Sequence, residues 1–327
     1  MNNDELLVSV VMSVFSEPES FIRMSIESIL AQTFDNFEFI IINDNPESKL
    51  NHELLLEYKY KDSRIIIVEN QINLGLACSL NIGLKMAKGM FIARMDADDV
   101  SLPNRLAIQV DFLRKNPLYG VCGTFVKTID VCNKLKKKVL LYSSDQDIKA
   151  YLLFASPFVH PTIMFRAELI KNYLYNEEFK RCQDYELWVR LSMVTYFYNI
   201  PTCLLYYRVY YDFKIKRNYA AIAGPLENKI KEMALKIYNI NESDKNKLIL
   251  FMNKDINICM KELNIWIIPF LNKMALINDS FLKVIIRKYI SLLISKRKFL
   301  SIFVNPIVKI NICFYYKILF GFIFGKC

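Results

Sequence analysis

Apolar and polar positions alternate with two different periods along the first third of the chain. Short apolar runs with almost no polar break are typical of strands that are buried on both faces of a sheet. Each run is followed by a segment in which apolar residues recur at the spacing of a helix. The predicted strands are residues 6–15, 37–42, 64–69 and 90–95, and the predicted helices are 16–33, around 50–60, 74–87 and 102–115. Such alternation predicts an α/β fold whose sheet is largely parallel, with right-handed crossovers.

The pattern becomes mixed after residue 119 and changes again near residue 212. Strands are predicted at 120–130, 160–166 and 203–211, and helices at 144–155 and 184–194. From residue 213 onward the pattern is helical and the composition is basic. We therefore predict a sheet-containing domain over residues 1–212 and a helical basic C-terminal region over residues 213–327.

The net charge of +10 is unevenly distributed. From Asp212 to the end there are 20 Lys and Arg residues against 8 Asp and Glu residues, and no acidic residue follows Ser280. A basic block of this kind suits nucleic acid or an anionic membrane surface. No window reaches 18 uninterrupted apolar residues, so no transmembrane helix is predicted. Residues 298–327 are expected either to lie at an anionic membrane surface or to pack on the first domain.

The remaining composition favours a folded cytoplasmic protein over a disordered or disulfide-stabilised one. Hydrophobic residues make up 53% of the chain, enough for a sizeable core. The 8 cysteines show neither zinc-type pairing nor the density of a disulfide framework. The N-terminus has no basic segment before its apolar run, unlike a signal peptide. We expect a cytoplasmic protein, peripheral on the inner face of the cell membrane.

Carboxylates follow two of the predicted strands. Asp44 comes directly after the strand at 37–42, and Asp96, Asp98 and Asp99 follow the strand at 90–95. In a parallel α/β sheet, ligands bind beyond the carboxyl ends of the strands. If both strands flank the first one, these carboxylates share one rim. Taken alone, Asp44 could also be an Asx-turn residue.

The Asp-Ala-Asp sequence at 96–98 is a candidate metal site. Residues i and i+2 of an extended segment point the same way, and the small Ala97 lets a ligand approach the backbone. Paired carboxylates suit a hard divalent cation such as Mg²⁺ or Mn²⁺, whose remaining ligands are often phosphates. The same cation would neutralise a diphosphate leaving group.

Several ordered motifs give the chain a family resemblance. The segments VSVVMSVFSEPES, FEFIIINDNPES, NLGLACSLNIG, FIARMDADDVSLPNRL, HPTIMFR and CQDYELWVRL resemble those of the family 2 glycosyltransferases. The resemblance spans roughly residues 6–212 and implies an inverting enzyme of GT-A fold, with a mixed sheet flanked by helices, that uses a nucleotide-sugar donor. It does not cover the C-terminal region.

The resemblance implies a role for individual residues. Asp184 matches the general base. Asp96 and Asp98 match the D-x-D pair, the first near the ribose and the metal and the second as a metal ligand. The residues implied in nucleotide-sugar binding are Ser13, Phe15, Glu17, Asp44, Asn73, Gly75, Asp96 and Ala97, with Asp44 matching the carboxylate that recognises the base, commonly uracil.

Asp184 also has a rationale of its own. Inversion in one displacement needs a carboxylate that accepts the proton of the acceptor hydroxyl, and burial often raises the pKa of such a group. The alternative is that Asp184 is the N-cap of the helix that it opens. Asp99 has a similar alternative, as a cap of the helix that follows it. His160 is either a site residue or a structural hydrogen-bonding residue, and Trp188 is expected in the core.

The sequence departs from the family pattern at three points. Gln183 stands where many relatives have Glu, beside the Asp184 on which the assignment rests. Tyr210 stands where many relatives have a histidine after the Tyr-Arg pair, so no histidine metal ligand is assigned. The Q-x-x-R-W signature and the membrane spans of processive synthases are missing, which favours transfer of a single sugar.

We therefore predict transfer of one sugar from a nucleotide-diphosphate sugar, UDP-linked by preference, with Mn²⁺ or Mg²⁺ as cofactor. The expected acceptor is a hydroxyl of a surface polysaccharide, lipopolysaccharide or lipid-linked saccharide. An anionic membrane surface is the other expected partner, and no nucleic acid is expected because no motif of that class is present. The alternative is a non-catalytic GT-A-like subunit. A sugar nucleotidylyltransferase would need a glycine-rich loop, which the segment SVFSEPES lacks.

Overall fold

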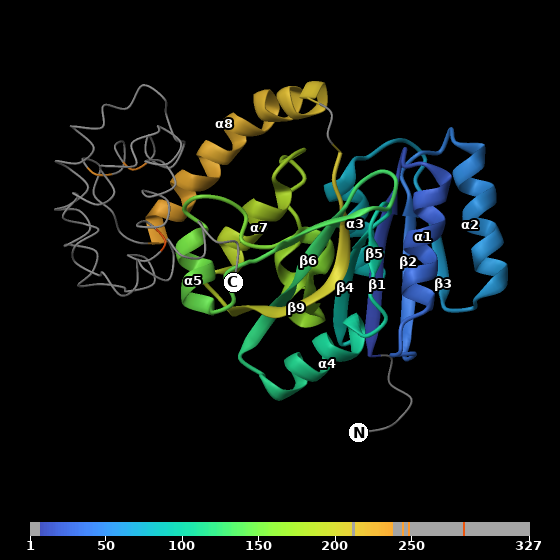
Figure 1. The fold of residues 1–327 in the computed structure, drawn as a ribbon, viewed down its shortest axis with the longest axis horizontal. Helices are drawn as coiled ribbons and strands as arrows, with labels where there is room; N and C mark the ends of the chain where they lie inside the picture. Colours follow the sequence, from blue (N-terminus) through green and yellow to red (C-terminus); the bar gives the residue numbers. More distant parts are fainter. Residues whose placement is uncertain (1–6, 211–212, 238–243, 245–247, 249–283, 285–327) are drawn as a thin grey trace. The chain divides into compact units, whose positions relative to one another are not determined.

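The computed structural model describes residues 7–210 and 213–237, together with residues 244, 248 and 284. The chain divides into two compact units, Met1–Tyr238 and Asn239–Cys327. The labelled helices and strands all belong to the first unit (Figure 1). The predicted membrane-binding segment at 298–327 lies outside the described residues, and the predicted boundary near residue 212 stays a prediction.

Four parallel strands form the first half of the sheet. They are β1 (Val8–Val14), β2 (Phe37–Asn43), β3 (Ile65–Glu69) and β4 (Phe91–Asp96), and their order is β3-β2-β1-β4. These strands confirm the predictions made from the four apolar runs. Their Val, Ile and Phe residues favour strands because branched and aromatic side chains pack well on a pleated surface.

The second half makes the sheet mixed. Its strands are β5 (Val100–Ser101), β6 (Tyr119–Ile129), β7 (Leu135–Val139), β8 (Met164–Arg166) and β9 (Tyr196–Arg208). The order continues β4-β8-β6-β9-β5, and β7 pairs with β6 off this path. Strand β8 is antiparallel to both β4 and β6, whereas β6 and β9 are parallel. The mixed sheet flanked by helices agrees with the GT-A expectation, although the segment at 160–162 is a 3₁₀ turn and not part of β8.

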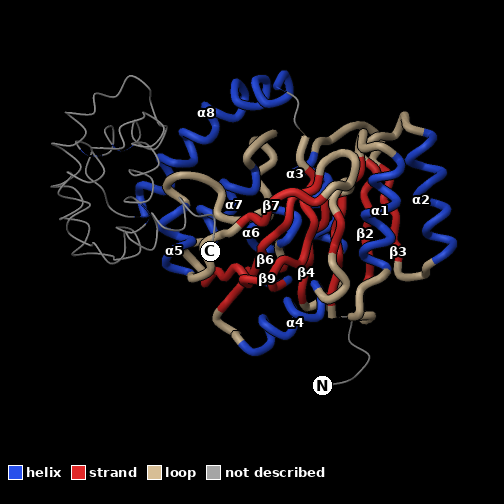
Figure 2. The backbone as a smooth tube through the Cα atoms, viewed as in Figure 1, coloured by secondary structure: helices blue, strands red, loops and turns tan. Residues whose placement is uncertain are grey.

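Helices cover the sheet on both faces (Figure 2). The helices are α1 (Glu19–Leu30), α2 (Lys49–Lys61), α3 (Leu76–Met86), α4 (Arg105–Lys115), α5 (Asp145–Tyr151), α6 (Ala167–Tyr173), α7 (Gln183–Leu191) and α8 (Phe213–Ile237), the last of which packs on α7. The six helices predicted before residue 195 are present within a few residues of their expected bounds. Of the helical region predicted from residue 213, α8 is described, and nearly all of the rest lies outside the described residues. Helix α6 and strands β5 and β7 were not predicted.

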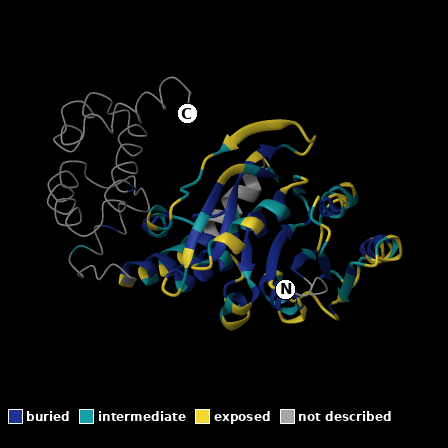
Figure 3. Cartoon of the chain, turned by 90° about the horizontal axis from the view of Figure 1, so that it is seen from below, coloured by how far each residue is buried: buried dark blue, intermediate teal, exposed yellow. Residues whose placement is uncertain are grey.

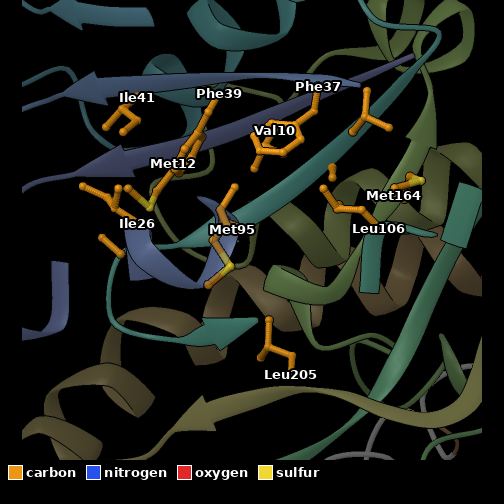
Figure 4. Close-up of a cluster of buried hydrophobic side chains, with 14 of the residues drawn as sticks. Val10, Met12, Ile26, Phe37, Phe39, Ile41, Met95, Leu106, Met164 and Leu205 are labelled. Atoms are coloured by element: carbon orange, nitrogen blue, oxygen red, sulfur yellow. The ribbon is translucent and has the colours of Figure 1, made fainter. Parts of the chain in front are cut away.

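The main core lies between the sheet and helices α1, α2 and α4. It contains alternate residues of the three central strands, such as Val10 and Met12 of β1, Phe39 of β2 and Met95 of β4, against Leu106 of α4 (Figures 3 and 4). These side chains are at most 3% exposed. Burying one such side chain contributes roughly 1.5–3 kcal/mol. The alternation leaves the other residues of β1 and β2 facing α3.

Helix α3 packs closely on that second face. A Cβ on Gly83 would lie 2.5 Å from a Val11 methyl group and 2.9 Å from Ile42 Cδ1, so only glycine lets the helix approach β1 and β2 this closely. Trp188 of α7 is fully buried, which confirms its predicted place in the core. Among the helices that the structure describes, none is both long and apolar enough to cross a membrane.

Candidate active site

The carboxyl ends of β2 and β4 meet on either side of β1. Ser13 of β1 is in register with Ile42 on one side and with Asp96 on the other. Both β2 and β4 therefore flank β1, which was the condition for Asp44 and the Asp96–Asp99 carboxylates to lie at one edge of the sheet. A cavity of about 420 Å³ opens at this edge of the sheet. The predicted site residues that line it are Ser13, Glu17, Asp96, Ala97, Asp98 and Asp184.

Four predicted nucleotide-binding residues lie outside the lining of this cavity. They are Phe15, Asp44, Asn73 and Gly75, all in loops at the same edge of the sheet. The Phe15 side chain is 43% exposed, and its carbonyl oxygen accepts hydrogen bonds from the side chains of Asn45 and Asn51. Asn73 is exposed in the loop before α3.

Asp44 holds that loop in place. Its carboxylate accepts hydrogen bonds from Asn70 Nδ2 at 2.7 Å, from the Leu74 backbone N–H at 2.8 Å and from the Gly75 N–H at 2.9 Å. Gly75 has a φ of 83°, which favours glycine. Asp44 is therefore not an Asx-turn residue, because its partners lie 26 to 31 positions away. Recognition of a base by Asp44 stays a prediction.

The three carboxylates after β4 lie close together. One oxygen from each of Asp96, Asp98 and Asp99 is within 4.8 Å of the others. Asp96 and Asp98 are half-buried, whereas Asp99 is fully buried and accepts a hydrogen bond from the Arg208 N–H at 2.7 Å. Burial and the nearby Asp98 raise the pKa of Asp99. Clustered carboxylate oxygens fit a hard divalent cation, so these residues are able to hold one.

The alternative role for Asp99 is wrong. Helix α4 begins at Arg105, and its N-cap is Asn104. Asp99 is instead the buried end of the carboxylate cluster, and its Oδ2 has no hydrogen-bond partner within the described part of the chain. Its neighbour Asp98 accepts a hydrogen bond from the Tyr210 hydroxyl at 2.8 Å. Tyr210, a departure from the family pattern, therefore contacts the second Asp of the D-x-D pair.

Sequence reasoning missed two buried arginines at this site. Arg94, two residues before Asp96 on the same face of β4, lines the cavity and forms an ion pair with Asp96. Burial lowers the pKa of its guanidinium. The signal in the sequence is a lone cation inside an otherwise apolar strand, which is costly unless it has a partner.

The second buried arginine is Arg208, at the end of β9. Its Nε donates to the Asp98 carbonyl oxygen at 2.7 Å, and its Nη1 donates to the Asp130 carbonyl oxygen at 2.9 Å and to Asn133 Oδ1 at 2.7 Å. Its guanidinium lies 3.8 Å from the centre of the Phe21 ring. Arg208 thus ties the D-x-D backbone to the turn between β6 and β7. The Tyr-Arg pair at 207–208 can be recognised in the sequence, but the contacts of Arg208 cannot be predicted from it.

Asp184 lines the same cavity as Asp96 and Asp98, although it comes from a distant part of the chain. It is the second residue of α7, whose N-cap is Cys182 with a left-handed φ of 57°. Asp184 is therefore not the N-cap, and that alternative is wrong. Burial raises the pKa of its carboxyl, and hydrogen bonds, including one from the Ser156 hydroxyl at 3.1 Å, oppose that effect.

His160 lines the cavity between these groups. Its Nε2 is 2.7 Å from the Tyr175 hydroxyl. Burial lowers the pKa of the imidazole well below its usual value, and the charge of Arg94 acts in the same direction. A neutral imidazole is therefore present at pH 7. The geometry allows both interpretations of His160, because the ring is hydrogen-bonded within the protein and also faces the cavity.

Two curated relatives are similar over most of the sheet-containing unit. An uncharacterized glycosyltransferase of Methanocaldococcus jannaschii is 39% identical over 209 residues, covering 63% of this chain and 72% of the relative. The O-antigen biosynthesis glycosyltransferase WbnJ of Escherichia coli is 35% identical over 208 residues, covering 62% of this chain and 80% of that protein.

A solved structure shows the same fold at lower sequence identity. Residues 1–349 of S. aureus TarS, crystallised with UDP, superpose with a TM-score of 0.57 at 16% identity, covering 80% of this chain and 78% of that one. The family model for Glycosyl transferase family 2 matches residues 9–174, about half of the chain. With its GT-A-type mixed sheet and its carboxylate-lined cavity, the chain belongs to glycosyl transferase family 2 and is a transferase enzyme.

Proposed function

We propose that this glycosyltransferase moves one sugar from a nucleotide-diphosphate sugar to a hydroxyl of a saccharide acceptor, with inversion at the anomeric carbon. One observation carries the proposal. The D-x-D carboxylates and Asp184 come from distant parts of the chain and line one cavity of about 420 Å³. A leaving-group site and a base are therefore adjacent, as a single displacement requires.

The donor side of the cavity is formed by β1, β4, the segments that follow these two strands, and Leu76 at the start of α3. We assign Asp98 and Asp96 to a divalent cation, Mg²⁺ or Mn²⁺, because both are half-buried and their oxygens lie close to each other. When bound, such a cation would offset the charge of the departing diphosphate. Ser13, Glu17 and Ala97 line the cavity beside this pair and are assigned to the nucleotide sugar.

The acceptor side is formed by α7 and the segment before β8. We assign Asp184 as the general base. In the reaction the acceptor hydroxyl oxygen forms a bond to the anomeric carbon and passes its proton to the Asp184 carboxylate. The bond from that carbon to the diphosphate oxygen breaks, and the diphosphate keeps the electron pair. The raised pKa of Asp184 suits this step because a stronger base accepts the proton more readily.

Uridine diphosphate is the first nucleotide to test. Phe15, Asp44, Asn73 and Gly75 lie in the loops next to the cavity and are assigned to the base and ribose, with Asp44 acting at least through the loop that it holds. TarS, which shares the fold, has been crystallised with UDP. The relative named for O-antigen biosynthesis favours a surface-polysaccharide or lipid-linked saccharide acceptor.

Attachment to an anionic membrane surface through residues 280–327 is a separate part of the proposal. It rests on the nine basic residues and the absence of acidic ones in that segment. The test is sedimentation with vesicles of phosphatidylglycerol and phosphatidylcholine, using the full chain and a chain ending at residue 279. Equal binding by both chains would refute it.

The donor is identified by a thermal-shift panel. Each of UDP-, GDP-, CMP- and dTDP-sugars is added to the full chain with Mg²⁺ or Mn²⁺, because a ligand that binds only the folded state raises the melting temperature. The expected result is stabilisation by one UDP-sugar that is lost with chelator. NMR of the product anomeric centre then tests inversion. Stabilisation without any donor hydrolysis or transfer would favour the non-catalytic alternative.

A further inference from the structure

Arg94 lies in the middle of an apolar strand, on the face that leads to the cavity. Phe91, Ala93 and Met95 of β4 point into the main core, so Arg94 and Asp96 share the opposite face. The Arg94 side chain is 4% exposed and lines the cavity. Its guanidinium is therefore nearly removed from bulk water but faces the space where a ligand would bind.

The cavity has an excess of negative charge around this cation. The acidic side chains that line it are Glu17, Asp96, Asp98 and Asp184, and Arg94 is the one Lys or Arg residue in the lining that the structure describes. A diphosphate entering the cavity would meet these carboxylates. Together with a divalent cation at the D-x-D pair, the guanidinium would attract the phosphate oxygens.

Arg94 differs from the buried arginines next to it because it lines the cavity, whereas Arg105 and Arg208 do not, although Arg105 Nε and Arg208 Nη2 also have no hydrogen-bond partner within the described chain. Arg105 donates to the carbonyl oxygens of Pro161 at 2.7 Å and Arg94 at 3.0 Å, and Arg208 donates to three oxygens of the surrounding loops. Arg94 has an ion pair with Asp96, and its Nε has no hydrogen-bond partner within the described chain. A buried N–H without a partner costs free energy, which a ligand oxygen would recover.

We propose that Arg94 is a donor-binding residue that donates hydrogen bonds to the diphosphate of the nucleotide sugar and of the released nucleotide, and shares its charge with Asp96. This inference rests on the proposed function and names the group that recognises the leaving diphosphate. Arginine fits the role because its planar fork of N–H donors matches the oxygens of a phosphate. In the absence of nucleotide, the ion pair to Arg94 competes with a metal ion for Asp96.

The test compares nucleotides that differ only in the terminal phosphate. Isothermal titration calorimetry of the full chain with Mg²⁺ gives the ratio of UMP to UDP dissociation constants for wild type, Arg94→Met and Arg94→Lys. The Arg94→Met change should lower this ratio by about tenfold or more, the usual effect of losing a charge-assisted hydrogen bond. Arg94→Lys keeps the charge and should lose only part of the ratio, because an ammonium group lacks the planar fork.

Arg166→Met is the matched control. Arg166 is a half-buried arginine at the end of β8, in register with Phe91 of β4, and it donates to the carbonyl oxygens of Leu113 and Tyr119. Its replacement should lower the melting temperature without changing the UMP to UDP ratio. Mn²⁺ binding without nucleotide, followed by electron paramagnetic resonance, should be as tight in Arg94→Met as in wild type or tighter.

The outcomes separate this inference from the proposed function. An unchanged UMP to UDP ratio in both Arg94 variants would overturn the role of Arg94 and leave the proposed function standing. Loss of Mn²⁺ binding in Arg94→Met would also overturn it, because Arg94 would then be needed to build the metal site. If wild type itself binds UDP, GDP and CDP no better than their monophosphates, the proposed donor class is wrong and this inference fails with it.

Discussion

Arg208 donates a hydrogen bond from Nε to the backbone carbonyl oxygen of Asp98 at 2.7 Å, across 110 positions of the sequence. The residue after the D-x-D pair, Asp99, is held by the backbone N–H of the same arginine. The end of β9 therefore holds in place the backbone segment that carries the candidate metal ligands. A site built in this way depends on a residue that lies outside the lining of the cavity.

Replacing Arg208 with Met should weaken both the fold and the metal site. The change removes the buried guanidinium and its bonds to Asp98, Asp130 and Asn133, so the free energy of unfolding should fall by about 2–4 kcal/mol. Mn²⁺ affinity should fall by about tenfold or more, as when a group that orients a ligand is lost. Urea denaturation and Mn²⁺ titration measure the two effects. A destabilised variant with wild-type Mn²⁺ affinity would show that Arg208 supports the fold alone.

Asp98→Asn should abolish metal-dependent nucleotide binding. The amide keeps the size of the side chain but removes the negative charge that a divalent cation needs. Calorimetry with UDP in the presence of Mg²⁺ and of chelator measures the effect. Asp111→Asn is the control, because Asp111 is an exposed carboxylate on α4 that pairs with Lys115. Full metal dependence in Asp98→Asn would remove this residue from the metal site.

Asp184→Asn should separate binding from turnover. Nucleotide binding should stay near wild type, whereas kcat should fall by about 10²–10⁴-fold, the usual contribution of a general base. In wild type, kcat should rise with pH as the base loses its proton, with a midpoint above the ordinary carboxyl pKa because burial raises the pKa of Asp184. If binding and kcat fell together, Asp184 would be a structural residue.

The same carboxyl has a predicted effect on stability. Since the pKa of Asp184 is raised in the folded state, the native protein binds more protons than the unfolded chain between the ordinary carboxyl pKa and the raised one. Its contribution is therefore fully present below the ordinary pKa and is lost as pH rises through the raised pKa. Asp184→Asn should melt higher than wild type at pH 7, and the difference should shrink on acidification. A lower melting temperature at pH 7 would contradict this reasoning.

Asp44→Asn tests whether this residue acts on the loop or only on the nucleotide. The amide has one acceptor oxygen in place of two, so at least one of the bonds to Asn70, Leu74 and Gly75 is lost. The free energy of unfolding should fall by about 1–3 kcal/mol. Asn73→Ala, in the exposed part of the same loop, should leave stability unchanged. If Asp44→Asn changed the preference for UDP over CDP at full stability, base recognition would be its main role.

The sequence predicts well what depends on local patterns. The apolar runs of β1 to β4 and the helical spacing between them are recognisable, because buried parallel strands and amphipathic helices have different periods. The D-x-D pair and Asp184 could be placed by motif. Strand β7 could not, since its three consecutive lysines have neither strand alternation nor β propensity, and it forms through pairing with β6.

Long-range partners could not be predicted either. Nothing in the sequence near Arg208 points to Asp98, and nothing near Asp44 points to the Gly75 N–H. Arg94 can be recognised in the sequence as a cation in an apolar strand. Its role, however, depends on which face of β4 it occupies and on which other segments line the cavity at that face. Such contacts are set by sheet order, which local periodicity does not determine.

Strand β7 has a further consequence for the behaviour of the protein at high concentration. It pairs with β6 alone among the described strands, so its other edge presents backbone donors and acceptors that another chain could extend. Lys136, Lys137 and Lys138 are all exposed along this short strand. Lys136 pairs with Asp130, and the positive charges of Lys137 and Lys138 repel an identical strand that approaches the edge, which opposes intermolecular sheet growth and aggregation.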